Sequence, residues 1–225
     1  MFKKISLLVL VMFCTDIAFG GTVKNYSADV VETGSGMAVG KVYAAEPKFR
    51  MEMYDENGNL EGMSIIRPDQ KKMYVCQSEN KTYFEIPIDG SASLFENMAK
   101  AGQSFGIVPD IKREKQGTET VIGYKTDKYR TVTTINAFGQ KLTTVVYEWM
   151  AAEFEYPVRI QTEDGAIVEM RNIKTGAQNA SLFEIPSGWT KDSSAAKMME
   201  SIGSQIDVLD LEEMFQGMSI PFSNE

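Results

Sequence analysis

The sequence has 225 residues, with 31 acidic and 23 basic side chains and a formal net charge of −8. An acidic chain without a basic run argues against binding to nucleic acid or to anionic lipid head groups. The absence of histidine excludes Ser-His-Asp and Cys-His catalytic arrangements and every histidine-based zinc site. We therefore expect no metal, no cofactor and no catalytic residues. An enzyme that works with carboxylates or lysines is the remaining catalytic alternative.

Residues 1–20 have the pattern of a cleavable secretory signal peptide. Two lysines precede an almost unbroken apolar run over residues 5–13, and small residues follow at Ala18 and Gly20. This run is shorter than the roughly 20 residues that span a bilayer, and no later segment is apolar and long enough to do so. We predict an exported, periplasmic protein whose mature chain starts directly after Gly20.

Only one of the two cysteines, Cys76, remains after such processing. Cys14 offers the alternative of a lipid-anchored protein, but the bulky Phe13 precedes it where a lipidation site needs a small residue. With a single cysteine left, no internal disulfide can form. Because Cys76 lies in the strand-like run MYVCQS, we expect a small buried hydrophobe rather than a reactive thiol.

Short strand patterns separated by turn-forming residues fill the region from residue 26 to residue 86. The strongest hairpin pattern is DENGN at residues 55–59. This spacing favours a continuous antiparallel sheet over βαβ units. The strands are predicted at residues 26–32, 37–44, 48–54, 62–67, 72–77 and 81–86.

Alternation within three of these strands predicts a shared apolar face. In residues 48–54 the odd-numbered side chains are apolar, whereas Arg50 and Glu52 point the other way. Methionine suits irregular cores and adaptable binding surfaces alike, so a plain core under a helix and a ligand-binding surface both fit, and a movable helix would reconcile them. The candidate ligand-binding residues are Phe49, Met51, Met53, Met63, Ile65, Met73 and Val75.

A first helix is predicted at residues 91–102, with a loop after it, and the second half of the sheet begins at Ile111. The run from Gly117 to Val132 reads as one long strand with a kink at Gly123, and an extra residue near Asp127 would restore its phase. Residues 131–135 continue this strand or follow it, and further strands are predicted at residues 141–149, 158–161 and 166–173.

The chain changes character at residue 192. Apolar side chains recur at helical spacing from residue 192 to residue 216, beside several acidic ones. One interpretation is a helix that docks over the open face of the sheet, and another is a partner-binding tail. The residues expected to cover the sheet are Met198, Met199, Ile202 and Ile206.

Three stretches resemble motifs of bacterial exported proteins of unknown function, which look like distant members of the lipoprotein-carrier superfold of LolA, LolB and RseB-type sensors. The stretches are GTETVIGYKTDKY from Gly117, Trp149 followed by YPV at 156–158, and LFEIPSGW at 182–189. The resemblance implies a strongly curved, incomplete antiparallel β-barrel with helices on its concave side and an apolar cavity that accepts acyl chains in the carriers. No stretch matches the carriers' membrane-inserting loop.

We therefore expect an α+β fold of about ten strands. Residues 21–191 would form the lipoprotein-carrier-like half-barrel, and residues 192–225 a methionine-rich amphipathic helix and tail. The leading functional prediction is non-catalytic binding of a lipid or other hydrophobic ligand in the periplasm. The alternative is an envelope interaction or sensor protein with a solid core and a partner-binding C-terminal helix.

Overall fold

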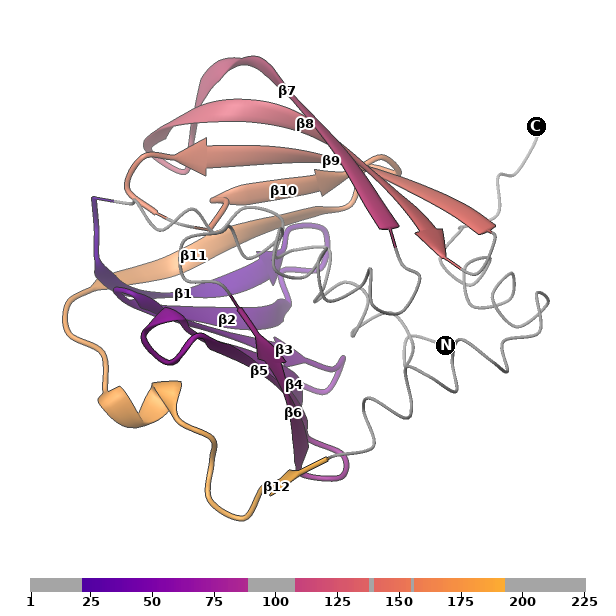
Figure 1. The fold of residues 1–225 in the computed structure, drawn as a ribbon. Coiled ribbons are helices and arrows are strands. Elements are labelled where there is room, and N and C mark those ends of the chain that lie inside the picture. The colour runs from indigo at the N-terminus through magenta and orange to yellow at the C-terminus, as the bar shows by residue number, and fades with distance from the viewer. Residues whose placement is uncertain (1–21, 89–107, 138–139, 155, 193–225) are drawn as a thin grey trace.

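The computed structural model describes residues 22–88, 108–137, 140–154 and 156–192, which form one sheet of twelve strands and two short 3₁₀ turns (Figure 1). The strands of the first half are β1 (Asn25–Glu32), β2 (Ala38–Ala45), β3 (Lys48–Tyr54), β4 (Leu60–Arg67), β5 (Lys72–Gln77) and β6 (Thr82–Pro87). Those of the second half are β7 (Val108–Val121), β8 (Tyr124–Ala137), β9 (Gln140–Ala151), β10 (Arg159–Thr162), β11 (Ile167–Thr175) and β12 (Thr190–Lys191). The 3₁₀ turns are η1 (Pro68–Gln70) and η2 (Ala180–Phe183).

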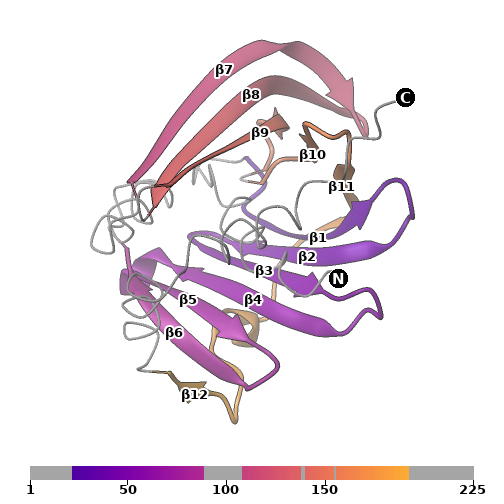
Figure 2. The same ribbon diagram turned by 90° about the vertical axis from the view of Figure 1, so that its right-hand side faces the viewer.

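The sheet is open, with the strand order β12-β6-β5-β4-β3-β2-β1-β11-β10-β9-β8-β7. Every neighbouring pair is antiparallel except β12 and β6. Figure 2 shows the sheet bent so that β7, β8 and β9 arch over the first strands. The bend defines an inner face, which carries Tyr26, Ala28 and Val30 of β1, and an outer face, which carries Ser27 and Asp29.

The expected α+β fold, with helices over the concave face of about ten strands, is wrong. The described residues are nearly all in strands, and none of them forms an α-helix. Strands also take up residues expected to be loop, since β7 starts at Val108. The predicted helix at residues 91–102 lies outside the described residues, and so does the one at 192–216 apart from Asp192. The expected cover residues Met198, Met199, Ile202 and Ile206 also lie outside them.

The predicted strands themselves are largely confirmed. All six between residues 26 and 86 are present, with ends that differ by at most two residues. The strands expected at 141–149, 158–161 and 166–173 correspond to β9, β10 and β11. Alternation and turn residues therefore located most of the sheet, because each of these strands has one apolar face and a recognisable turn beside it.

The single long strand expected from Gly117 to Val132 is wrong, because the chain reverses in the middle of it. Val121 pairs with Tyr124, and the two residues between them have positive φ angles of 46° at Ile122 and 89° at Gly123. Positive φ at both central positions defines the two-residue hairpin turn that matches strand twist. The register shift lies between Lys115 and Gly117 of β7, and not near Asp127. The stretch is therefore the tip of a long β7–β8 hairpin.

The main core lies on the inner face, where two rows of side chains cross the first five strands in register. All ten side chains are buried and none is charged. Rings from the β9–β10 loop pack beside them: Phe154 lies 4.9 Å from Tyr26 and Tyr156 lies 6.2 Å from Phe49, between ring centroids. From β1 to β5, the first row is Tyr26, Ala44, Phe49, Ile66 and Met73, and the second row is Ala28, Val42, Met51, Ser64 and Val75.

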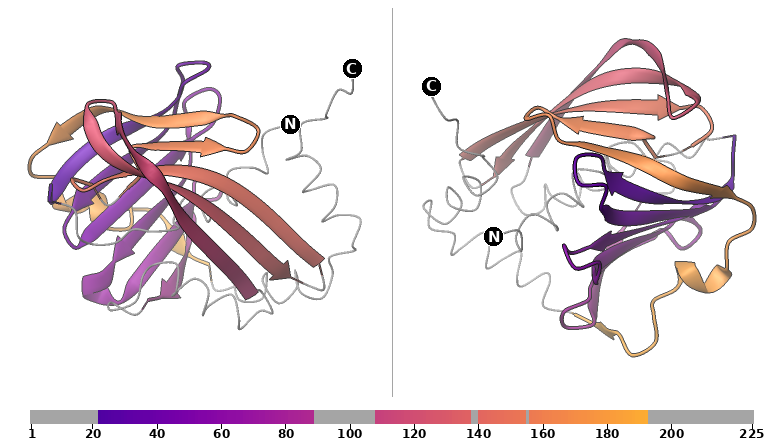
Figure 3. Two further views of the ribbon diagram at one scale, coloured as in Figure 1. Left: turned by 90° about the horizontal axis from the view of Figure 1, so that it is seen from above. Right: turned by 180° about the vertical axis from the view of Figure 1, so that it is seen from behind.

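A second, smaller core lies on the outer face, under the segment that follows β11. We call residues 176–192 the C-terminal strap. It includes η2 and β12 and passes outside β3 to β6, as Figure 3 shows in the view from behind. Phe183 of the strap is buried against Met63 and Ile65 of β4, together with Cys76 of β5. The strap thus connects the middle of the sheet to its β6 edge.

Candidate functional site

The structure places five of the seven candidate ligand-binding residues on the inner face. Phe49, Met51 and Met53 of β3 and Met73 and Val75 of β5 all belong to the main core. Met63 and Ile65 of β4 lie on the outer face instead, against Phe183. The expectation that all seven share one face is therefore wrong for these two residues. That the remaining five bind a ligand stays a prediction.

The misassignment on β4 follows from its register. Met63 pairs with Glu52 and Ile65 pairs with Arg50, so both share the face of these charged residues. The inner face of β4 is formed by Gly62, Ser64 and Ile66. Because Met63, Ile65 and Ile66 are all apolar, β4 lacks the alternation that identifies a face, and a one-residue error in phase exchanges the faces.

Small residues shape one side of the inner face. A Cβ atom at Gly40 would lie 2.6 Å from the main-chain oxygen of Glu52, so only glycine fits there. A Cβ atom at Gly62 would lie 3.0 Å from the main-chain oxygen of Cys76 and 3.8 Å from the Cε atom of Met53. Two glycines beside Met53 therefore leave this flexible side chain room along the sheet.

Polar groups enter the inner face at two places. In the second row, the Ser64 side chain is fully buried, and its Oγ atom has no hydrogen-bond partner. On the arch formed by β7, β8 and β9, Glu148 is 3% exposed and accepts a hydrogen bond of 2.6 Å from the Thr131 hydroxyl. Glu148 shares its face with Ile160 of β10, its partner in the ladder, and so with the main core.

Arg113 of β7 completes the polar group on the arch. Its Nε atom lies 3.4 Å from Oε2 of Glu148. Its guanidinium carbon lies 4.0 Å from the centre of the Tyr129 ring, which is a close cation–π contact. A buried carboxylate needs such partners, because desolvation of an isolated charge is costly. The inner face is thus uncharged in the two rows on β1 to β5 and carries an ion pair on the arch.

Near the β7–β8 turn, the buried side chains of β8 and β9 lie on the opposite face from those further along the two strands. Thr126 and Trp149 are buried there, on the face opposite to that of Thr131 and Glu148. The Trp149 indole donates from Nε1 to Glu119 at 2.6 Å, and its ring lies 4.5 Å from the Lys128 ammonium. Trp149, one of the residues that carry the sequence resemblance, therefore packs near the tip, where it joins the buried residues of the main core.

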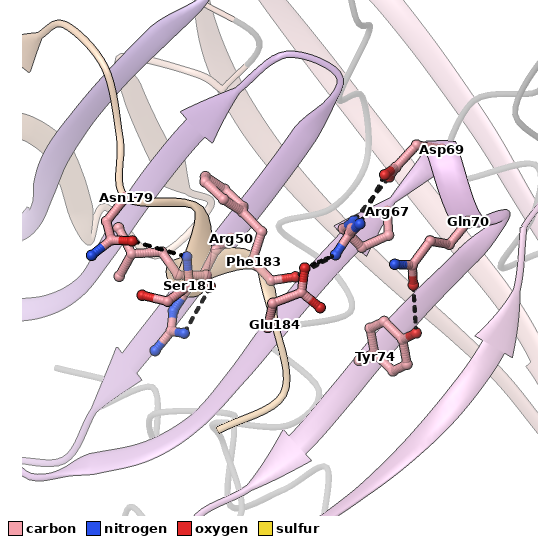
Figure 4. Close-up of polar contacts among 10 residues, drawn as sticks. Arg50, Arg67, Asp69, Gln70, Tyr74, Asn179, Ser181, Phe183 and Glu184 are labelled. Atoms are coloured by element: carbon pink, nitrogen blue, oxygen red, sulfur yellow. Dashed lines mark hydrogen bonds and ion pairs between the residues drawn. The ribbon is translucent and has the colours of Figure 1, made fainter. Parts of the chain in front are cut away.

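Two buried arginines on the outer face hold the C-terminal strap (Figure 4). Arg50 donates from Nη1 to the main-chain oxygen of Leu182 at 2.9 Å and also contacts Glu52. Arg67 donates from Nη1 to the main-chain oxygen of Phe183 at 2.9 Å and to the Glu184 carboxylate at 2.6 Å. These bonds satisfy the carbonyl groups of η2.

Arg67 is itself fixed from the other side. It donates from Nε and Nη2 to the two oxygens of Asp69, at 2.9 and 2.8 Å. The same hydrogen bonds lower the pKa of the Asp69 carboxyl. Fork-to-fork pairing of this kind orients the guanidinium as well as neutralising it. Sequence reasoning missed this contact, because only the crossing of the strap over β4 brings Arg67 and Glu184 together.

Three further observations concern metal binding, membrane spans and the buried cysteine of the described residues. No three His, Cys, Asp or Glu side chains in them lie close enough to hold a metal ion. No described helix has the length and apolar character that a membrane span requires. Burial raises the pKa of the Cys76 thiol to about 12, as expected of a small buried hydrophobe.

A depression of about 260 Å³ lies where the β7–β8 tip meets β11. Its volume is below the roughly 300–1,000 Å³ of typical ligand pockets. Its lining residues are Ile122, Tyr124, Met170, Arg171, Asn172 and Ile173.

Several solved structures align with this chain. An uncharacterized conserved protein from Thermus thermophilus has 12% identity and a TM-score of 0.45, over 83% of this chain and 99% of that one. PNGF-II has 12% identity and a TM-score of 0.49, over 81% of this chain and 34% of that one. The Mycobacterium tuberculosis lipoprotein LppX has 17% identity and a TM-score of 0.32, over 76% of this chain and 97% of that one.

A search of curated proteins gave no match. A family of unknown function does match part of the chain, which confirms the resemblance to such a family expected from the sequence. Residues 30–137, which run from β1 to the end of β8, match the family described as a domain of unknown function, DUF4412.

Proposed function

We propose that this protein is an exported, non-catalytic protein that holds a lipid or another hydrophobic ligand against the inner face of its sheet. The observation that carries the proposal is the pair of uncharged rows that run in register across β1 to β5. An acyl chain laid along such rows gains about 0.8 kcal/mol for each methylene group removed from water. The methionines Met51, Met53 and Met73 can adjust to its shape.

The contrast between the two faces supports this choice of site. Charged side chains sit among the core residues of the outer face: Arg50 and Glu52 of β3 are both buried there. The strap already covers that face, through Phe183 and the arginine contacts. The inner side of these strands is therefore the uncharged one, and it is the side on which an apolar ligand would bind.

The export part of the proposal rests on residues 1–20, whose lysines, apolar run and small residues fit a cleavable signal peptide. On this proposal the mature protein works in the periplasm, without a membrane span or a lipid anchor at Cys14. Residues 21–191 would form the binding domain and residues 192–225 a separate C-terminal region.

A second candidate function is an envelope interaction or sensor protein whose inner face is a filled core. The observation that favours it is the close packing of Phe154 and Tyr156 beside Tyr26 and Phe49, with all these side chains buried. On this alternative, the region that follows the strap would bind the partner protein.

Photo-crosslinking with a diazirine-bearing fatty acid distinguishes the two candidates. The ligand-binding proposal predicts saturable crosslinks to inner-face residues of β3 and β5, namely Met51, Met53 and Val75, that excess unlabelled fatty acid prevents. The proposal would be overturned if crosslinks formed only on the outer face. It would also be overturned if excess unlabelled fatty acid did not reduce the crosslinks. An Asp substitution at the exposed Glu56 in the β3–β4 turn serves as a control that leaves labelling unchanged.

A further inference from the structure

The inner face is chemically divided between the first strands and the arch. The two rows on β1 to β5 contain no charged side chain. On the arch, the side chains that point to the same face include Thr131, Thr133, Glu148 and Arg113. A ligand made only of hydrocarbon would match the apolar rows alone, whereas an amphipathic ligand would match both the rows and the polar side chains of the arch.

We propose that the ligand is an amphipathic anion and that Arg113 binds its carboxylate or phosphate head group. This inference rests on the proposed function, because the acyl chain of the same ligand would lie on the apolar rows. A planar guanidinium matches the geometry of carboxylate and phosphate groups and forms strong, charge-assisted hydrogen bonds with them.

Exposure decides which member of the ion pair meets the ligand. The side chain of Glu148 is 3% exposed, whereas that of Arg113 is 23% exposed. Glu148 is therefore a positioning residue: it accepts from Thr131 at 2.6 Å and lies 3.4 Å from Nε of Arg113. The Tyr129 ring supports the guanidinium from the side, at 4.0 Å. Because Glu148 and Tyr129 already hold the guanidinium, Arg113 loses little conformational freedom when an anion binds.

Two other charged residues on this face, Lys115 and Asp127, pair with each other. Lys115 of β7 lies 2.7 Å from Asp127 of β8, and this pair is much more exposed than Arg113 and Glu148. The hydrogen bond from Lys115 lowers the pKa of Asp127, so the pair stays ionised at neutral pH. The Lys115–Asp127 pair therefore adds no net charge to this face.

The experiment compares three ligands with the same twelve-carbon chain: laurate, dodecyl phosphate and 1-dodecanol. Each displaces the neutral dye Nile red from the full-length protein, and the displacement constants are compared. We expect laurate and dodecyl phosphate to bind about tenfold more tightly than dodecanol. The paired variant R113Q/E148Q, which removes both charges and so leaves no buried carboxylate alone, should lose this preference and keep dodecanol binding.

Two further variants test the assignment to Arg113. E148Q keeps the guanidinium but removes the carboxylate that positions it, so the anion preference should weaken without being lost. R130Q removes an arginine from the opposite face of β8, where Arg130 pairs with Tyr147, and should change nothing. If none of the three ligands displaces the dye, the proposed function fails and this inference fails with it. If dodecanol binds as well as the anions, or if R113Q/E148Q keeps the preference, Arg113 is not the head-group site although the apolar rows still bind.

Discussion

The guanidinium of Arg67 donates a hydrogen bond of 2.9 Å to the main-chain oxygen of Phe183, which lies 116 residues further along the chain. Phe183 places its ring in the outer core while its carbonyl group is held by this bond. One arginine on β4 thus fixes the strap at the point where the strap crosses the sheet. The strap in turn covers Met63, Ile65 and Cys76, so the outer core depends on the contact.

Replacing Arg67 by methionine should loosen the strap. The variant removes charge-assisted bonds to Asp69, Phe183 and Glu184. We expect a loss of about 2–3 kcal/mol in the free energy of unfolding, because bonds to charged groups contribute more than neutral ones. Urea denaturation measures this loss, and hydrogen exchange should rise first in residues 180–191. R130M, on the outer face of β8, is the matched control, and equal stabilities of the two variants would contradict the assignment.

Acid should detach the strap before it unfolds the sheet. Hydrogen bonds from Arg67 lower the pKa of Asp69, and the hydrogen bond from Lys191 lowers the pKa of Glu85. A carboxyl whose pKa is lowered by folding stabilises the native state above its ordinary pKa, and this stabilisation is lost as pH falls through the lowered value. We therefore expect protection of residues 182–191 against hydrogen exchange to fall below about pH 4.

The variant D69N/E85Q provides the control for this acid effect. It removes both titrating carboxyls, so its strap should be less protected at pH 7 and should respond weakly between pH 5 and pH 3. Exchange is compared after correction for the intrinsic rate at each pH. An acid response as large as that of the unmodified protein would assign the effect to other groups.

Cys76 should resist thiol reagents in the folded protein. Its side chain is buried on the outer face, and burial raises its pKa to about 12, so almost no thiolate exists at neutral pH. Reaction with Ellman's reagent at pH 8 should be slow and limited by opening of the structure, and it should become immediate in denaturant. A cysteine introduced at the exposed Ser35 should react at once in the folded state. Equal rates at the two positions would show that the outer core is open.

Alanine at Gly40 should destabilise the sheet. The new Cβ atom would meet the main-chain oxygen of Glu52 at 2.6 Å, and a backbone atom cannot move away without disturbing the β2–β3 ladder. We expect a loss of about 1–3 kcal/mol, as for other overpacked positions. G62A is the comparison variant. Its new Cβ atom would lie 3.0 Å from its nearest neighbour, so it should lower the free energy of unfolding by less. A Gly40 variant as stable as the unmodified protein would mean that the two strands separate easily.

The sequence predicted the first half of the sheet well because its strands alternate. In β3, the charges at Arg50 and Glu52 mark the outer face, so Phe49, Met51 and Met53 were assigned correctly. β4 carries charges only near its ends, at Glu61 and Arg67, and its outer face is apolar between them because Phe183 packs there from a distant segment. No local pattern reports a contact of that range, so the faces of β4 could not be assigned.

The turn at Ile122 was missed for a different reason. A β-branched residue with a φ of 46° is rare, so Ile122 reads as part of a strand. The ion pair of Arg113 and Glu148 was missed because it depends on two strand pairings, β7 with β8 and β8 with β9, that bring distant residues together. A glutamate between Tyr147 and Trp149 in an otherwise apolar stretch was the one local indication of a buried charge.

The most direct test of the central claim, that the inner face holds a hydrophobic ligand, is a native mass spectrum. The full-length gene is expressed in a bacterial host, and the protein purified from its periplasm is measured under native and denaturing conditions. The account predicts an added mass that is lost on denaturation and fragments as a lipid. A mass that corresponds to the protein alone, unchanged after incubation with fatty acids or phospholipids, would contradict it.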